Sequence, residues 1–156
     1  MIYSELVEVI CYNSLNRIDA SKEHIVSALS VAKGMILVQK EQPFPKLIND
    51  TQGLILADQL ELADTFFTRL RGLMFRPPLL PGSALWLRPC NGVHMCFMRY
   101  PIDVLFLDRD LTVVQVVENL QPWRAVPYVP RAASAIEFVA GTLTGKVSVE
   151  DQVRII

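Results

Sequence analysis

The sequence predicts a mainly β protein, α+β at most, in which a small sandwich-like β-barrel has one helix packed across it. From residue 43 onward, short apolar runs alternate with turn residues, which is the rhythm of an all-β domain. The run Val104–Leu107 is continuously apolar, which is typical of a strand covered on both faces. Only one segment after residue 43 has the apolar periodicity of a helix.

The chain changes character near residue 43, so we expect two parts. Residues 1–42 hold two helical patterns, one over about residues 4–15 and one that Asp19 or Ser21 could cap. Both are short for independent stability, so this N-terminal extension forms two short helices or is partly disordered. A translation start at Met35 is a further alternative. Residues 43–156 are expected to form a single compact domain.

Eight strands are expected in this domain. The first follows the segment 43–45, which is a linker or an edge strand because proline cannot donate to a central ladder. A hairpin turn at residues 108–110 should join the fifth strand to the sixth. The expected strands are Lys46–Asn49, Leu54–Gln59, Ala84–Leu87, His94–Arg99, Ile102–Leu107, Val113–Glu118, Ala135–Val139 and Gln152–Ile155.

The single helix should begin after Asp64 or Thr65, either of which can cap it, and end before Pro77. Gly72 lies within this pattern, and a glycine inside a helix costs about 1 kcal/mol relative to alanine. We therefore expect close packing of the helix on the sheet at this position. The apolar stripe that would pack on the sheet consists of Phe66, Phe67, Leu70, Leu73 and Met74.

Composition and charge exclude several classes of function. Of 156 residues, 51% are apolar, and 15 basic against 16 acidic side chains leave a net charge of −1. This balance argues against bulk-charge attraction to nucleic acid or to an anionic membrane. No apolar run reaches the roughly 18 residues of a membrane-spanning helix, and Glu5 and Glu8 stand where a signal peptide is basic. We expect a cytoplasmic protein without nucleic-acid or membrane partners, and the oligomeric state stays open.

Arginine usage is unusual between Leu47 and Gly145. This stretch has eight arginines and no lysine. Arginine is preferred over lysine where a planar fork must bind carboxylate or phosphate or stack on an aromatic ring. The arginines either form ordinary surface salt bridges or line an anion-receptive pocket. They are Arg69, Arg71, Arg76, Arg88, Arg99, Arg109, Arg124 and Arg131.

Two cysteines and a histidine lie close together in the sequence. Cys90, His94 and Cys96 could supply three ligands of a zinc ion. There is no C-x-x-C pair and no evident fourth ligand, and the neighbouring Met95 and Phe97 indicate core, so we predict no metal and no cofactor. A strand here would place His94 and Cys96 on one face, about 7 Å apart, which is too far for a nucleophile and its base.

Two acidic residues lie inside apolar segments. Asp103 precedes the apolar run of the fifth expected strand, and Glu137 lies within the seventh. Burying an unpaired carboxylate is costly, so each should have an arginine, a histidine or backbone amides as partners. With His94 and the arginines these acids form either an active site or a satisfied internal ion-pair network.

A proline-rich loop carries two further candidates. Trp123 and Arg124 follow Pro122, and Pro127 and Pro130 come next. Such a stiff loop is a pocket lid, an interaction surface or a cover for the end of the barrel. The candidate ligand-binding residues are therefore Arg71, His94, Asp103, Trp123, Arg124 and Glu137.

Several motifs together resemble the domain of unknown function 192 family over about residues 46–156. They are the segment 63–76, His94 with residues 97–98, the segment 102–108, and Glu137 followed by Gly141. The resemblance implies a compact mainly β domain, a small sandwich-like barrel with one helix, and brings no established activity.

The sequence departs from this family at two places. Glu150-Asp151 stands where the family usually has a Gly-Asp turn before the last strand. Cys96 falls where aromatic or aliphatic residues are common, which further disfavours a cysteine-based mechanism.

Three functions compete. The favoured hypothesis is a non-catalytic binding domain, in which Arg71, His94, Asp103 and Glu137 form a polar pocket for a small anionic or carbohydrate-like ligand, with Trp123 at its mouth. One alternative is an interaction or scaffold protein that uses the N-terminal helices or the loop 122–130. A second alternative is a hydrolase with His94 as general base and Asp103 as its orienting acid, for which no nucleophile is identified.

Overall fold

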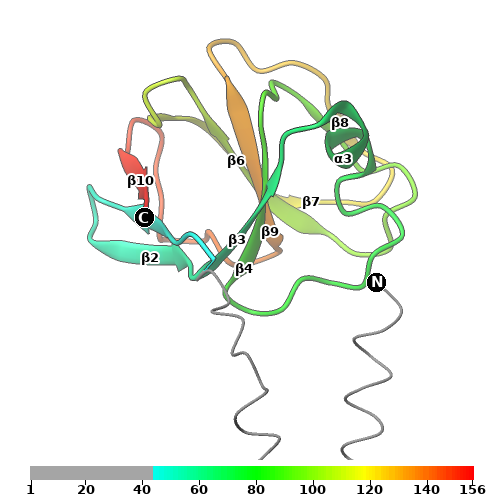
Figure 1. The fold of residues 1–156 in the computed structure, drawn as a ribbon, viewed down its shortest axis with the longest axis horizontal. Coiled ribbons are helices and arrows are strands. Elements are labelled where there is room, and N and C mark those ends of the chain that lie inside the picture. Colours follow the sequence, from blue (N-terminus) through cyan, green and yellow to red (C-terminus); the bar gives the residue numbers. More distant parts are fainter. Residues whose placement is uncertain (1–43) are drawn as a thin grey trace, which may run out of the picture. The chain divides into compact units, whose positions relative to one another are not determined.

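A computed structural model describes residues 44–156 of this chain (Figure 1), which form ten strands and one short helix. The longest sheet runs in the order β3 (Gln59–Ala63), β4 (Ser83–Leu87), β9 (Ser134–Val139), β6 (Ile102–Leu107) and β7 (Val113–Leu120). A second sheet runs β10 (Val153–Ile155), β1 (Leu47–Asn49) and β2 (Leu54–Ala57), and a third pairs β5 (Val93–His94) with β8 (Ala125–Val126). The β3–β4 pair is parallel, and the other pairs are antiparallel.

The mainly β class is confirmed, but the predicted barrel is wrong. In the described part of the chain the five-stranded sheet stays open, because its edge strands β3 and β7 do not pair with each other. Its two faces are covered by different elements instead. Figure 1 shows the three-stranded sheet on one side of the five-stranded sheet, and α3 with β8 on the other.

Strand β6 lies at the centre of the fold. All six of its residues are buried, as the apolar run predicted. Leu105 and Leu107 contact one core cluster, which includes Leu47 and Val153 of the three-stranded sheet. The other face of β6 contributes to a second cluster with Leu73 and the buried residues Val93, Met95, Met98 and Val129. The five-stranded sheet therefore divides the core into two layers.

Most of the expected strands are confirmed within one or two residues. Seven of the eight correspond to β1, β2, β4, β6, β7, β9 and β10. The hairpin at residues 108–110 is confirmed, since β6 and β7 pair in antiparallel register across it. The turn before β10 forms although the chain has Glu150 where the family has glycine, and Glu150 takes a positive φ of 70°.

The expected strand His94–Arg99 is wrong. Its strand pairing ends at His94, and the backbone then turns: the amide of Met98 donates to Met95 O (3.3 Å), and Phe97 has φ 60°. His94 and Cys96 therefore do not share a strand face. Met95 is held by the loop 121–124 instead, because its amide donates to Arg124 O and its carbonyl accepts from Trp123 N. Strands β3 and β8 were not predicted from the sequence.

The helix α3 (Phe66–Arg71) is shorter than predicted. Thr65 caps it in a reciprocal capping box with Thr68, and Gly72 ends it with φ 45° rather than lying inside it. None of its residues is buried, so the expected apolar stripe is wrong for Phe66, Phe67 and Leu70. Of that stripe only Leu73, in the turn after the helix, is buried.

The helical patterns before residue 43 lie outside the described residues. Within residues 44–156, no helix is long and apolar enough to cross a membrane.

Asp103 of β6 is fully buried and links three segments. Its Oδ1 accepts from the backbone amide of Asn119 at the end of β7 (2.8 Å), and its Oδ2 accepts from the amide of Leu143 (3.0 Å). In the strand register it lies opposite Phe138, on the face of the sheet away from Glu137. Two amide donors thus take the place of the arginine or histidine that a buried carboxylate could also use.

We expect Asp103→Asn to lower the free energy of unfolding by roughly 2–4 kcal/mol, because one amide donor would then face the new side-chain NH₂ group. Urea denaturation at neutral pH measures this loss. The exposed hairpin variant Asp110→Asn serves as the matched control and should change stability by less than about 0.5 kcal/mol. Equal effects of the two substitutions would contradict the role of the two buried amide bonds.

Candidate functional site

A cavity of about 270 Å³ lies between the end of α3, the loop that leads into β5, and β9. Glu137 reaches it from β9, His94 from β5 and Arg71 from the last turn of α3. Glu137 is buried, whereas Arg71 and His94 are exposed. The cavity therefore has a buried acid and an outer part with basic side chains, to which Arg69 also contributes.

Two glycines shape this cavity. At Gly72 a Cβ atom would stand 3.6 Å from Glu137 Oε2, so the missing side chain leaves the carboxyl open on that side. At Gly92 a Cβ atom would come within 2.4 Å of the carbonyl oxygen of Pro127, a contact so short that only glycine fits at this position. Gly92 thus allows the close approach by which β5 pairs with β8 and carries His94 to the cavity. The sequence signalled Gly72 but assigned it to helix packing, and it gave no signal for Gly92.

Glu137 is the unusual residue of the site. It pairs with Leu85 of β4 and Val104 of β6 in the middle of the five-stranded sheet. Its Oε2 atom is buried and has no hydrogen-bond partner. The other such atom among the described residues is Trp86 Nε1, and Trp86 does not line this cavity. An orphaned buried carboxylate oxygen is expensive, which indicates a functional reason to keep it.

Burial raises the pKa of Glu137 from 4.5 to about 7, and the positive charge of Arg76 offsets only part of this rise. Arg76 is itself engaged, since both of its terminal nitrogens contact the carboxylate of Glu61 at 3.1 and 2.8 Å. At neutral pH the buried carboxyl is therefore close to half protonated. It can donate or accept a hydrogen bond, a property that suits acid–base chemistry or ligand binding.

Cys90 lies beside this acid as a protonated thiol. Burial raises its pKa, the backbone of Gly92 opposes part of this rise, and the carboxylate of Glu137 raises the pKa further. Sγ donates to Gly92 O at 3.0 Å, a bond that only the protonated thiol can make. A nucleophilic cysteine needs the opposite shift, so this thiol is a poor nucleophile. Among residues 44–156 no three His, Cys, Asp or Glu side chains are arranged to hold a metal ion, and Cys96 does not line the cavity.

The structure brings together only half of the predicted ligand-binding residues. Arg71, His94 and Glu137 line one cavity. Asp103 lies on the opposite face of the sheet with both oxygens bonded to amides, so it forms no dyad with His94. The other two, Trp123 and Arg124, are exposed in the loop after β7 and do not line this cavity.

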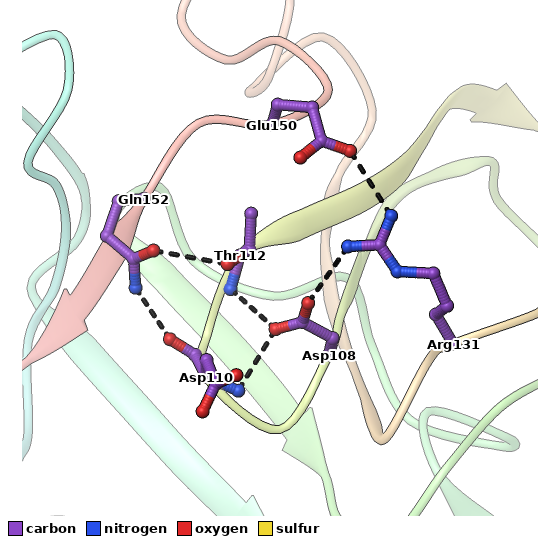
Figure 2. Close-up of polar contacts among 6 residues, drawn as sticks. All are labelled: Asp108, Asp110, Thr112, Arg131, Glu150 and Gln152. Atoms are coloured by element: carbon purple, nitrogen blue, oxygen red, sulfur yellow. Dashed lines mark hydrogen bonds and ion pairs between the residues drawn. The ribbon is translucent and has the colours of Figure 1, made fainter.

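A second cavity, next to the β6–β7 hairpin, is lined by Asp108 and Arg131, which form a salt bridge with each other. Figure 2 shows the carboxylate of Asp108 between the turn and Arg131. Its Oδ1 accepts from the amides of Asp110 and Thr112 (both 3.0 Å), and its Oδ2 pairs with Arg131 (3.2 Å), which also reaches Glu150 (3.4 Å). Burial raises the pKa of Asp108, but these bonds outweigh it, so the pKa lies below its usual value. This cluster stabilises the hairpin.

Residues 47–155 match the model of a protein family described as "DUF192: Uncharacterized ACR". The chain belongs to the domain of unknown function 192 family. The resemblance seen in the sequence motifs is thus confirmed. Every residue that lines the cavity around Glu137 lies inside the matched range.

Curated members of the family are similar in sequence. The UPF0127 protein of Thermococcus sibiricus is 39% identical over 95 residues, which are 56% of this chain and 58% of that protein. The UPF0127 protein of Pyrococcus horikoshii is 37% identical over 92 residues, which are 55% of this chain and 75% of that protein. Neither name states an activity.

Two solved structures share the fold. A protein of unknown function from Novosphingobium aromaticivorans has a TM-score of 0.62 at 23% identity, with 70% of this chain and 83% of that chain covered. A protein of Sinorhizobium meliloti, described as a putative transcription regulator, has a TM-score of 0.60 at 26% identity, with 71% and 91% covered.

The raised pKa of Glu137 makes the stability of this family member dependent on pH. Between pH 4.5 and about 7 the unfolded chain has lost the proton that the folded protein keeps, so the free energy of unfolding falls as pH rises. Glu137→Gln lacks the titrating carboxyl, so its free energy of unfolding should not fall in this way. Between pH 4.5 and pH values above 7, the stability of this variant relative to the wild type should therefore rise by about 3 kcal/mol.

Urea denaturation of the two proteins at several pH values between 4 and 8 measures this difference, with Glu118→Gln on the exposed side of β7 as control for the loss of a carboxylate. A difference between Glu137→Gln and wild type that does not change with pH would contradict the assignment.

Proposed function

We propose that this chain is a non-catalytic binding domain for a small anionic, hydroxyl-bearing ligand of the sugar-acid class, bound in the cavity around Glu137. The observation that carries the proposal is the buried Oε2 atom of Glu137, which has no protein partner although its residue lines the cavity. A ligand hydroxyl group that donates to this oxygen would remove the cost of leaving it unpaired.

The basic side chains at the outer part of the cavity support an anionic ligand. Arg71 is exposed at the end of α3, and no acidic side chain forms a salt bridge with it among the described residues. Its planar fork suits a carboxylate, and His94 adds a donor on the other side of the cavity. One end of such a ligand would bind arginine while its hydroxyl groups reach Glu137.

The size of the cavity also favours a small molecule. At about 30 Å³ for each molecule of liquid water, 270 Å³ corresponds to roughly nine waters, which is the scale of a monosaccharide rather than of a polymer. The apolar part of the wall comes from Leu73, Leu87, Val93 and Met98, which suits the carbon face of a sugar ring.

Thermal-shift and calorimetric titrations with galacturonate and gluconate, and with galactose as the uncharged comparison, test the proposal. At about 100 times Kd a bound sugar acid should stabilise the wild-type protein by about 2.7 kcal/mol. Arg71→Ala should fold normally and lose this stabilisation, because its side chain is exposed and its role is to bind the carboxylate.

Arg109→Ala, an exposed arginine of the hairpin outside this cavity, removes the same charge and should bind like the wild type. The proposal fails if the wild type binds neither sugar acid, or if it binds galactose as tightly as galacturonate. It also fails if Arg71→Ala and wild type bind a sugar acid equally well.

A further inference from the structure

A second feature of the molecule lies outside the proposed ligand cavity. The rings of Phe75 and Phe97 stack with centroids 5.2 Å apart, and Trp123 meets Phe97 edge-to-face, also at 5.2 Å. We call these three residues the aromatic platform. Their exposed fractions are 67%, 51% and 65%. Exposed aromatic residues that gather in this way mark interaction surfaces, whereas isolated ones need no explanation.

The backbone holds these rings in place with unusual geometry. Phe75, Phe97 and Trp123 all have positive φ, between 60° and 64°. This region is rarely occupied by bulky side chains, and such outliers cluster at functional sites. The loops that carry Phe97 and Trp123 are bonded to each other through Met95, whose carbonyl accepts from Trp123 N at 2.9 Å. The rings are thus presented to solvent by a defined backbone rather than by unrestrained loops.

The segment that carries Phe75 and Phe97 has charged side chains of one sign only. Residues 65–102 contain no aspartate, glutamate or lysine, although the whole chain has a net charge of −1. Arg99 lines a cavity of about 450 Å³ together with Phe75 and Phe97. Arg76 lines it too and is paired with Glu61, while the other four arginines of this stretch form no salt bridge within residues 44–156. These four are Arg69, Arg71, Arg88 and Arg99.

This composition is that of a protein interface. Interfaces are enriched in aromatic residues, methionine and arginine and depleted in lysine and acidic residues, and their anchors are most often tryptophan, tyrosine and arginine. We propose that the aromatic platform, with Arg99 beside it, is the docking surface for an acidic polypeptide segment that carries aromatic side chains. The three rings do not line the Glu137 cavity, although the hollow beside them shares Leu73 and Met98 with it, and the proposal does not depend on what that cavity binds.

Charge complementarity selects this partner. A second copy of the chain docking through the same face would bring another Arg99 to the contact rather than a carboxylate to pair with the first. An acidic segment with aromatic anchors offers carboxylates to Arg99 and rings to the platform, in the way that arginine clusters recognise acidic motifs.

Fluorescence anisotropy with the full chain tests this proposal, using a labelled random copolymer of glutamate and tyrosine as the probe and poly-glutamate as the polymer without aromatic groups. We expect the copolymer to bind, and poly-glutamate to bind at least about tenfold more weakly, the loss typical of a removed interface anchor. Trp123→Gly and Phe97→Gly should each weaken copolymer binding by about tenfold, since glycine keeps the positive φ while removing the ring.

Tyr128→Ala is the matched control, because Tyr128 is 64% exposed in the same proline-rich loop but is not part of the platform. It should bind the copolymer as the wild type does, and thermal denaturation verifies that all variants fold. The proposal is overturned if the copolymer does not bind or if Tyr128→Ala is as damaging as Trp123→Gly. Equal binding of poly-glutamate, or of single-stranded oligo(dT), would assign the face to polyanions in general and would equally overturn it.

Discussion

The burial of β6 on both faces is the constraint on which the rest of this fold depends. A strand of six buried residues needs a cover on each side of its sheet, and no single element of this short domain supplies both. The three-stranded sheet covers one face through Leu47 and Val153, and loops with the small β5–β8 sheet cover the other through Val93 and Val129. The cavity lies on the side that is covered mainly by loops.

Two buried carboxyl groups show how differently these faces treat a charge. On the face of the three-stranded sheet, Asp103 receives two backbone amides and serves as a structural link. On the loop-covered face, Glu137 sits on the neighbouring strand, and its Oε2 finds no donor. The pKa near 7 follows from this environment, because burial without compensating hydrogen bonds destabilises the charged form. A structural role would be served better by an apolar residue, which makes Glu137 the stronger functional candidate.

The sequence predicted the features that local patterns determine. The apolar run of β6, the hairpin at residues 108–110 and the class of the domain follow from periodicity and turn chemistry alone. It also selected Arg71, His94 and Glu137, because polar residues in apolar surroundings need a reason. It could not tell that Asp103 and Glu137 face opposite sides of the sheet, since that depends on the register between β6 and β9.

Two of the errors have a common physical cause, because they fall where the backbone leaves regular geometry. The expected helix stops at Gly72, which has a positive φ. The expected strand His94–Arg99 loses its pairing after His94, and the backbone turns at Phe97, which also has a positive φ. For Phe97 the left-handed conformation costs about 1–2 kcal/mol, and the conformational propensities of the local sequence do not predict it. Such a stretch has the sequence pattern of a strand, but its conformation is set by hydrogen bonds to a loop that is distant in the sequence. Its own residues therefore do not reveal that it is not a strand.

The free-energy cost of left-handed backbone conformations also indicates why the aromatic platform is present. Three aromatic residues in the left-handed region together cost roughly 3–6 kcal/mol, a large part of the stability of a typical domain. Half or more of each side chain remains exposed, so burial in this chain recovers only part of that cost. Asparagine or glycine at these positions would relieve the strain without loss of core packing. Selection for stability alone would therefore remove Phe75, Phe97 and Trp123, and their presence together at one surface indicates that the rings are kept for contact with another molecule.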